Sequence, residues 1–209
     1  MTSKTTARVL QTACALAVAC AMACNGALGT DKTPEPPASA LESESFLTPV
    51  AEAREAGIEP YWLGEEFEAG GLRFIVHPTA DLTDAADSRY PGLSLDYFAR
   101  TAKGSARTGV EMYSKAGKGP QIMLDRTRAV AGVSVEELQL AGWPANLVTV
   151  PLPPRPVNKL WLFVDAGDTV VIVQANSGAT GVPGTDPNPL IDKDLLIQVV
   201  AENLQPIPE

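Results

Sequence analysis

Two strongly apolar segments within residues 160–175 constrain the fold of this chain more than any other feature. The first reads Leu-Trp-Leu-Phe-Val and the second Thr-Val-Val-Ile-Val-Gln-Ala, and a short Asp-Ala-Gly-Asp turn joins them. Such segments are typical of two β-strands in a hairpin. Because successive side chains of a strand point to opposite faces, both faces of this hairpin are apolar. The hairpin is therefore expected in the middle of a sheet that is covered on both faces.

The alternation along the first segment assigns its side chains to faces. Leu160, Leu162 and Val164 share one face, whereas Trp161 and Phe163 share the other. The second segment repeats this arrangement with two pairs on opposite faces: Val170 and Ile172, Val171 and Val173. Neither segment offers a polar stripe to solvent, so an edge position is disfavoured.

Five shorter segments complete the predicted sheet. They cover residues 72–76, 93–98, 109–114, 121–125 and 147–150. The segment Ala-Gly-Lys-Gly at 116–119 is predicted to close a hairpin between the third and the fourth of them.

Capping residues predict helices at both ends of the domain. The first helix follows Thr48 as its N-cap, has Pro49 in its first turn and ends near Gly57. The last helix begins near Pro189 and carries a broad apolar stripe as far as Leu204. Two prolines beyond it prevent its continuation.

A third helix is predicted in the middle of the domain. Ser134 and Glu137 fit a capping box, Val133 and Leu138 fit a hydrophobic staple, and Gly142 fits the stop. Strands in runs with helices at the start, middle and end predict the α+β class. We expect a mostly antiparallel β-sheet with a C-terminal amphipathic helix packed on one face.

The chain divides into three segments by composition. Residues 1–23 are predicted to be an export signal, because Lys4 and Arg8 precede an Ala-rich apolar segment at 9–22. Residues 24–45, rich in Pro, Ser, Ala, Thr and Glu, are predicted to be a disordered tether, because they cannot bury enough apolar surface. Residues 46–209 are predicted to form a single α+β domain.

The end of the export signal resembles the lipobox of bacterial lipoproteins. The motif is Ala21-Met22-Ala23-Cys24, followed by the polar tether. The resemblance implies lipidation of Cys24, cleavage before it, and a membrane anchor on the extracytoplasmic side of the cell envelope. Ala21 stands where the family usually has Leu, so ordinary cleavage after Ala23 is an alternative. Cys20 is a rival lipidation site, and small apolar filler is the third interpretation of these cysteines.

Charge and cysteine usage exclude several functions. The formal net charge of -9 argues against nucleic-acid binding, which needs a basic surface. All three cysteines lie within the first 24 residues, so the domain has neither a disulfide nor a cysteine metal site. His77 is the only histidine, which argues against a histidine-rich zinc centre. We therefore expect no cofactor and no metal.

Two polar segments are candidate ligand sites with simpler interpretations. The glycine-rich segment 176–184 lacks the Lys-Ser/Thr of a phosphate-binding loop, so a surface connection is favoured. Asp81, Asp84 and Asp87, with Ser88 beside them, do not have the spacing of a calcium-binding loop, which favours a solvated acidic segment. His77 has no nucleophile motif near it and is predicted to be a surface residue.

Carboxylate pairs and aromatic residues are the remaining candidates. Glu65-Glu66 and Glu136-Glu137 are adjacent acidic pairs, and the second is predicted in the first turn of a helix, where the dipole favours it. Three aromatic residues could line a ligand cleft or pack in the core, and the core is favoured. They are Tyr61, Trp62 and Trp143.

No reaction signature stands out, so the expected function is a non-catalytic binding or interaction domain on an envelope-tethered lipoprotein. The alternative is an anchored or secreted hydrolase with a carboxylate acid/base pair. A purely structural envelope protein is the third possibility. The expected partners are the membrane, through the lipid anchor, and a ligand or protein that the sequence does not name.

Overall fold

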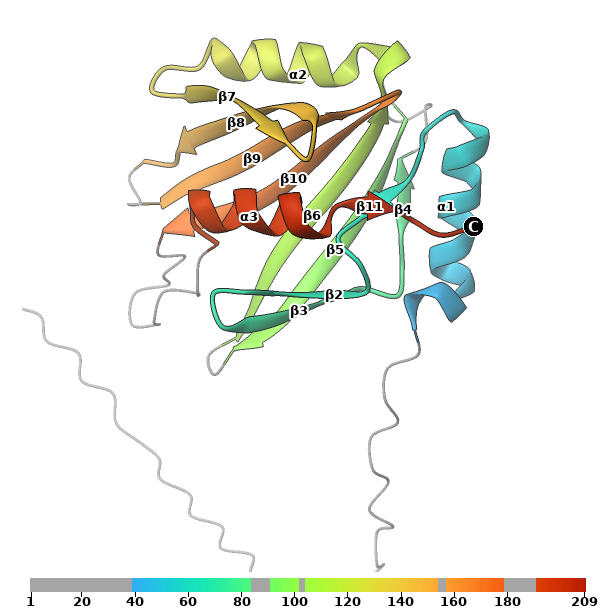
Figure 1. The fold of residues 1–209 in the computed structure, drawn as a ribbon. Coiled ribbons are helices and arrows are strands. Elements are labelled where there is room, and N and C mark those ends of the chain that lie inside the picture. Colours follow the sequence, from blue (N-terminus) through green and yellow to red (C-terminus); the bar gives the residue numbers. More distant parts are fainter. Residues whose placement is uncertain (1–38, 84–90, 102–103, 154–156, 179–190) are drawn as a thin grey trace, which may run out of the picture. The chain divides into compact units, whose positions relative to one another are not determined.

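The computed structural model describes residues 39–83, 91–101, 104–153, 157–178 and 191–209 (Figure 1). Cys24 and residues 1–38 lie outside this part of the chain. Residues 37–209 form one compact unit. Its described residues are mostly antiparallel β-sheet with three α-helices, one of them C-terminal, which is broadly the predicted α+β class.

The main sheet has nine strands in the order β2-β3-β5-β6-β10-β9-β8-β7, with β4 paired to β5. Its strands are β2 (Glu66–Ala69), β3 (Leu72–Val76), β4 (Asp81–Thr83), β5 (Gly92–Thr101), β6 (Gly104–Ser114), β7 (Ser134–Leu140), β8 (Trp143–Pro151), β9 (Val157–Ala166) and β10 (Thr169–Gly178). A separate two-stranded ladder pairs β1 (Tyr61–Trp62) with β11 (Gln205–Pro206). The helices are α1 (Glu44–Glu55), α2 (Gly119–Arg128) and α3 (Lys193–Asn203), with short 3₁₀ turns η1 (Ala40–Glu42) and η2 (Lys115–Gly117).

The hairpin predicted at 160–175 is confirmed as β9 and β10. The two strands are antiparallel neighbours, with Val164 opposite Val171. On its other side β10 pairs with β6, and β9 pairs with β8, so the hairpin lies in the middle of the sheet. Its two faces differ in what covers them. We call the face that carries Leu160, Leu162 and Val164 the inner face and the face that carries Trp161 and Phe163 the outer face.

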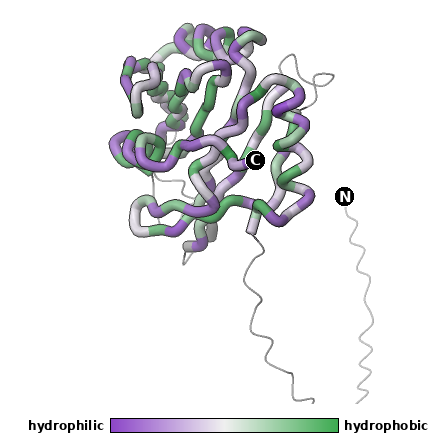
Figure 2. Tube along the Cα trace, turned by 45° about the vertical axis from the view of Figure 1, so that its right-hand side comes forward, coloured by the Kyte–Doolittle hydropathy of each residue, from purple (hydrophilic) through white to green (hydrophobic). Residues whose placement is uncertain are grey.

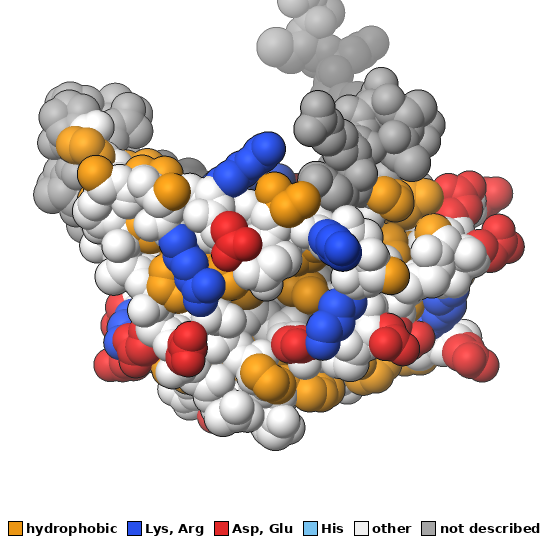
Figure 3. All heavy atoms as spheres, turned by 90° about the horizontal axis from the view of Figure 1, so that it is seen from above, with side chains coloured by type: hydrophobic (Ala, Val, Ile, Leu, Met, Phe, Trp, Pro, Cys, Tyr) orange, Lys and Arg blue, Asp and Glu red, His pale blue; other side chains and the backbone are white. Residues whose placement is uncertain are grey.

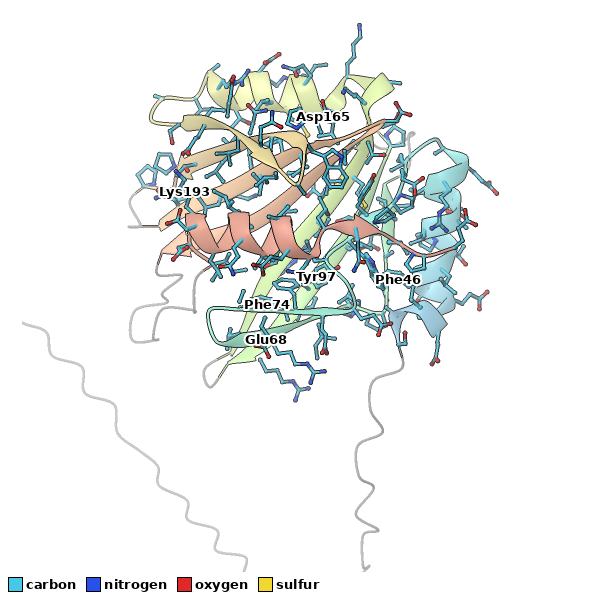
Figure 4. The ribbon with its side chains drawn as sticks, in the orientation of Figure 1. Phe46, Glu68, Phe74, Tyr97, Asp165 and Lys193 are labelled. Atoms are coloured by element: carbon cyan, nitrogen blue, oxygen red, sulfur yellow. The ribbon has the colours of Figure 1, made fainter. Side chains whose placement is uncertain are left out.

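The inner face carries the larger hydrophobic cluster. Leu160, Leu162 and Val164 of β9 belong to it, as the alternation predicts, and each is at least 98 % buried. Helix α1 contributes three residues from one side, and the alternation of green and purple along it in Figure 2 reflects that single buried face. Leu196 and Val200 of α3 belong to the same cluster. Phe74 and Tyr97 lie in its interior (Figure 4).

The outer face carries a second, smaller cluster under α2. Leu124 of α2 packs there with Val148, Phe163 and Ile172 from three adjacent strands. Trp161 is partly buried against them. The hairpin is thus covered on both faces near its turn, which agrees with its two-sided apolar pattern.

The helix predicted to start at Ser134 is wrong, because residues 134–140 form β7. Val133 and Leu138, which fit a hydrophobic staple in the sequence, do not meet in the structure: Val133 packs on the outer cluster and Leu138 on the inner one. Ala141 and Gly142 have φ angles of 49° and 89° and form the two-residue turn into β8. Gly142 therefore ends a strand hairpin and not a helix.

The strand predicted at 121–125 is also wrong, because this segment lies within α2. Pro120 occupies the first turn of the helix, and Gln121 donates a hydrogen bond to Asp125 one turn later at 2.9 Å. A short apolar segment such as Ile-Met-Leu at 122–124 has no period that separates strand from helix. The strands predicted at 72–76, 93–98, 109–114 and 147–150 are confirmed within β3, β5, β6 and β8.

Helix α1 begins at Glu44, earlier than the predicted cap at Thr48, and contains Pro49. Proline lacks the N–H that would donate to the carbonyl of Ser45, four residues earlier. The amide of Ala80 donates to that carbonyl instead, at 3.1 Å, so the proline is tolerated inside the helix. Within the predicted tether, residues 40–42 form η1 and residues 44–45 begin α1.

Helix α3 begins at Lys193, later than the predicted start near Pro189, and residues 179–190 lie outside the described part of the chain. Asp192 caps the helix by accepting a hydrogen bond from the amide of Leu195 at 2.8 Å. Beyond α3 the chain forms β11, whose Pro206 lies opposite Tyr61.

We predict that Ile172→Asp lowers the free energy of unfolding by several kcal/mol, because Ile172 is 1 % exposed and a buried carboxylate there has no cationic partner in the outer cluster. Val130→Asp is the control, because Val130 is 53 % exposed, and it should change stability by less than about 0.5 kcal/mol. Chemical denaturation of the three proteins measures both values. Equal stability of Ile172→Asp and the unmodified chain would contradict burial of β10 under α2.

Candidate functional site

Helix α2 covers the outer face at one end of the sheet (Figure 1). At that end, seen from above in Figure 3, Lys and Arg side chains are interspersed with Asp, Glu and hydrophobic ones. We call the rest of the outer face the open half. It lies over β3, β5, β6 and those ends of β9 and β10 that are remote from α2. The residues that alternate with the buried core positions lie there: Ser94, Asp96, Phe98, Arg100, Arg107, Gly109, Glu111, Lys159 and Gln174.

A polar recess of about 230 Å³ lies in the open half. It is lined by eight residues of β5, β6, β9 and β10: Ser94, Asp96, Arg107, Gly109, Glu111, Lys159, Gln174 and Ala175. Gly109 has no side chain, and a Cβ added there would lie 3.7 Å from Asp96 Oδ1 and 4.0 Å from Gln174 Cβ. The absence of a side chain at this position keeps the middle of the recess open.

An Asp96–Arg107 ion pair forms one wall of the recess. Arg107 Nε donates to Asp96 Oδ1 at 2.7 Å, and Arg107 Nη2 donates to Asp96 Oδ2 at 2.8 Å. The Arg107 side chain is 63 % exposed, so the pair contributes at most about 1 kcal/mol to stability. Its two-point geometry mainly holds the guanidinium in a defined orientation.

Glu111 is the centre of a hydrogen-bond network on the opposite wall. Gln174 Nε2 donates to one carboxylate oxygen, and the Tyr113 hydroxyl donates to the other at 2.9 Å. Burial, and secondarily the charge of Glu111, raises the pKa of Tyr113, which therefore stays a donor. Gly92 allows this ring position, because a Cβ there would lie 2.5 Å from Tyr113 Cε1.

Lys159 is the cation of the recess without an anionic partner. Its ammonium lies 4.7 Å from the centroid of the Trp161 ring, a cation–π distance. No carboxylate in the described part of the chain lies within ion-pair distance of its Nζ. Burial lowers the pKa of Lys159; the negative charge of Glu111 raises it, and the positive charge of Arg107 lowers it further.

An apolar hollow of about 540 Å³ adjoins the recess. Its apolar lining includes Ile75 and Phe98, which lie opposite each other on β3 and β5 and are 39 % and 37 % exposed. Phe98 also lies opposite Arg107 of the recess, so the two depressions meet at this pair. Arg73 and Arg100 line the hollow, where polar and apolar groups alternate.

A third depression, of about 140 Å³, lies beneath the start of α2. Its apolar lining includes Leu124, Phe163 and Val170. Lys115 Nζ lies 2.7 Å from both carboxylate oxygens of Asp165, which spans one side of it (Figure 4). Lys118 also lines this depression, so it has one paired and one unpaired lysine among the described residues and, unlike the polar recess, no second carboxylate.

His77 lies at the rim of the apolar hollow and is exposed, as the sequence predicts. Its ring meets the Phe98 ring edge-on, with the centroids 5.8 Å apart. Asp81 lies in β4, whereas Asp84, Asp87 and Ser88 lie outside the described residues. Among the residues that are described, no group of three His, Asp or Glu side chains has an arrangement that suits a metal ion.

The predicted carboxylate pairs have separate structural roles. Glu66 forms an ion pair with Arg73, and Glu65 accepts a hydrogen bond from Ser39. Glu136 lies in β7 and not at a helix start, so the dipole explanation for it was wrong; it forms an ion pair with Lys193.

The aromatic candidates pack in the core. Tyr61 and Trp62 are 8 % and 4 % exposed. The ring of Trp143 meets that of Tyr61 edge-on, with the centroids 5.6 Å apart. The glycine-rich segment 176–184 is described only as far as Gly178, where β10 ends. None of the helices in the described part of the chain has both the length and the hydrophobicity to cross a membrane.

Sequence reasoning missed the polar recess. The available signal was the alternation of polar with apolar residues in β5 and β6, as in Ser94-Leu95-Asp96 and Arg107-Thr108-Gly109. This alternation identifies outward-facing positions, but it does not show which strands are neighbours. Lys159 is separated from Glu111 by 48 positions in the sequence, and only the pairing of β6 with β10 and of β10 with β9 brings them together.

Comparison with known proteins gives this chain no family. No known protein family, curated protein or solved structure matches it. Function is therefore inferred from the geometry of the open half and from the residues that precede the domain.

Proposed function

We propose that this chain is an envelope-tethered bacterial lipoprotein whose domain is a non-catalytic binding module. The open half of the outer face is its binding surface. The observation that carries the proposal is the preformed polar recess on a sheet face that α2 covers only at one end. Ligand sites are typically concave and contain a few converging polar groups beside apolar surface.

The recess is held in shape by the strands that carry it. Asp96 and Arg107 fix each other through two hydrogen bonds, and Glu111 is fixed by Gln174 and Tyr113. Binding to such a site orders few additional side chains, which lowers the entropic cost. The neighbouring Phe98 supplies exposed apolar surface that a ligand can cover.

The proposal includes the packing of α3 on the inner face. Leu196, Val199 and Val200 of α3 share the large hydrophobic cluster with the inward side chains of the central hairpin. A helix in that position closes the inner face, so the outer face is the side of the sheet that is available for a ligand.

The alternative of a carboxylate-pair hydrolase has less support. Asp96 and Glu111 both line the recess, but each accepts hydrogen bonds on both of its oxygens. These hydrogen bonds hold both carboxylates against the sheet face. The acid of such a hydrolase must instead reach the leaving-group oxygen of its substrate. The arrangement therefore favours recognition over acid/base chemistry.

The membrane anchor is the second part of the proposal, and it depends on the lipobox-like Ala21-Met22-Ala23-Cys24. Cleavage before Cys24 removes Lys4 and Arg8, which changes the formal net charge from -9 to -11. Attachment must then come from lipid and not from charge. Several acyl chains on one residue give stable anchoring, whereas a single chain holds a protein only marginally.

We predict that Cys24→Ala abolishes both fatty-acid labelling and membrane retention. Cells that express the full chain are grown with a clickable fatty acid, and label is measured in the membrane and soluble fractions. Cys20→Ala is the matched control and should keep the label, because Cys20 lies in the segment that is removed. A wild-type protein that is soluble and unlabelled would contradict the anchor.

A photoreactive benzoylphenylalanine in place of Phe98 tests the binding surface in the same cells. Irradiation is expected to give a defined mass adduct on the purified chain, because Phe98 lies beside the recess. The same group at Val130, which is 53 % exposed, is the control and should give none. Absence of an adduct at position 98, or the same adduct at position 130, would contradict the open half as the binding surface.

A further inference from the structure

The two cations of the polar recess differ in whether they have an ion-pair partner. Arg107 already donates to both oxygens of Asp96, whereas Lys159 has no carboxylate partner in the described part of the chain. The ammonium of Lys159 is half-buried against Trp161, where it is attracted by the charge of Glu111, with which no ion pair is formed, and repelled by that of Arg107. Burial of a cation without an ion-pair partner is costly, and a ligand anion in direct contact would reduce that cost.

The recess as a whole has no net charge. Lys159 and Arg107 supply two positive charges, and Asp96 and Glu111 supply two negative charges. A ligand with a net charge of two, such as a phosphate dianion, gains no net attraction, because the two carboxylates repel it as the two cations attract it. A neutral ligand with separated positive and negative ends is attracted at both.

The remaining hydrogen-bonding capacity supports both ends of such a ligand. Arg107 uses two of its five N–H donors on Asp96, which leaves donors for a ligand carboxylate beside Lys159. Each oxygen of Glu111 accepts one hydrogen bond and has a second lone pair for a ligand ammonium.

Building on the proposed function, we propose that the polar recess binds a small zwitterion of the amino-acid or short-peptide class, with the ligand carboxylate on Lys159. At about 30 Å³ for each water, a volume of 230 Å³ corresponds to about eight waters, which is the size of a free amino acid. The adjoining hollow, where Phe98 and Ile75 are exposed, accommodates an apolar side chain of the ligand.

The test is isothermal titration of the full chain in detergent with matched probes. The probes are the twenty free amino acids, Gly-Phe and Ala-Ala, the C-terminal amides of both dipeptides, and neutral monosaccharides. We expect at least one amino acid or free dipeptide to bind. We also expect the C-terminal amide of that ligand, prepared if it is a free amino acid, to bind at least tenfold more weakly.

The variants locate the carboxylate. Lys159→Met should weaken binding at least tenfold at unchanged melting temperature, and Lys159→Arg should restore part of it. Lys118→Met is the matched control, because Lys118 lines the separate depression under α2, and it should bind like the unmodified chain.

The amide comparison is made on the unmodified chain, so it is decisive even if a variant folds poorly. Equal binding of acid and amide, or unchanged binding by Lys159→Met, would overturn the inference. Binding of monosaccharides alone would overturn it and leave the binding module standing. No binding by any probe at 10 mM, on the order of the weakest affinities of interest, would also overturn it. The adduct at position 98 then decides the proposed function separately.

Discussion

Burial of the central hairpin on both faces is the constraint on which the rest of the structure depends. Strands β9 and β10 present large side chains to both sides, so each side requires a cover. The inner side chains join the large cluster with α1, β2, β3 and α3, and the outer side chains near the turn join α2. Helices thus contribute to the hydrophobic clusters on both faces of the sheet: α2 to the outer cluster, and α1 and α3 to the inner one.

The open half follows from the length of one of these covers. Helix α2 has ten residues and is therefore about 15 Å long, whereas β5 and β6, with ten and eleven residues, extend about 33–37 Å. A cover of that length cannot span the outer face. On β9 and β10, the outward residues under α2 are the apolar Phe163 and Ile172. Further along the same strands, the outward residues Lys159 and Gln174 are polar and line the recess.

Sequence reasoning located most strands of the sheet and misassigned two segments, β7 and α2. The hairpin was predicted from its nearly uninterrupted apolar residues, whereas the segments within β5 and β6 also contain polar residues. Strand β7 was mistaken for a helix because Ser134, Glu137 and Gly142 fit helix caps. The apparent staple of Val133 and Leu138 in fact packs on two different clusters. The recess was beyond reach, because Lys159 and Glu111 meet only through strand pairing that a single sequence does not encode locally.

Among the residues that the structure describes, α2 covers one half of the outer face and leaves the other half open. Thiol labelling tests it most directly, because the natural cysteines all lie within residues 1–24 and are distinguished by peptide mass. A maleimide should modify Ser94→Cys, in the recess and partly exposed, in the folded chain. It should modify Val148→Cys, under α2, only after denaturation. Equal labelling rates at the two positions in the folded chain would contradict the account.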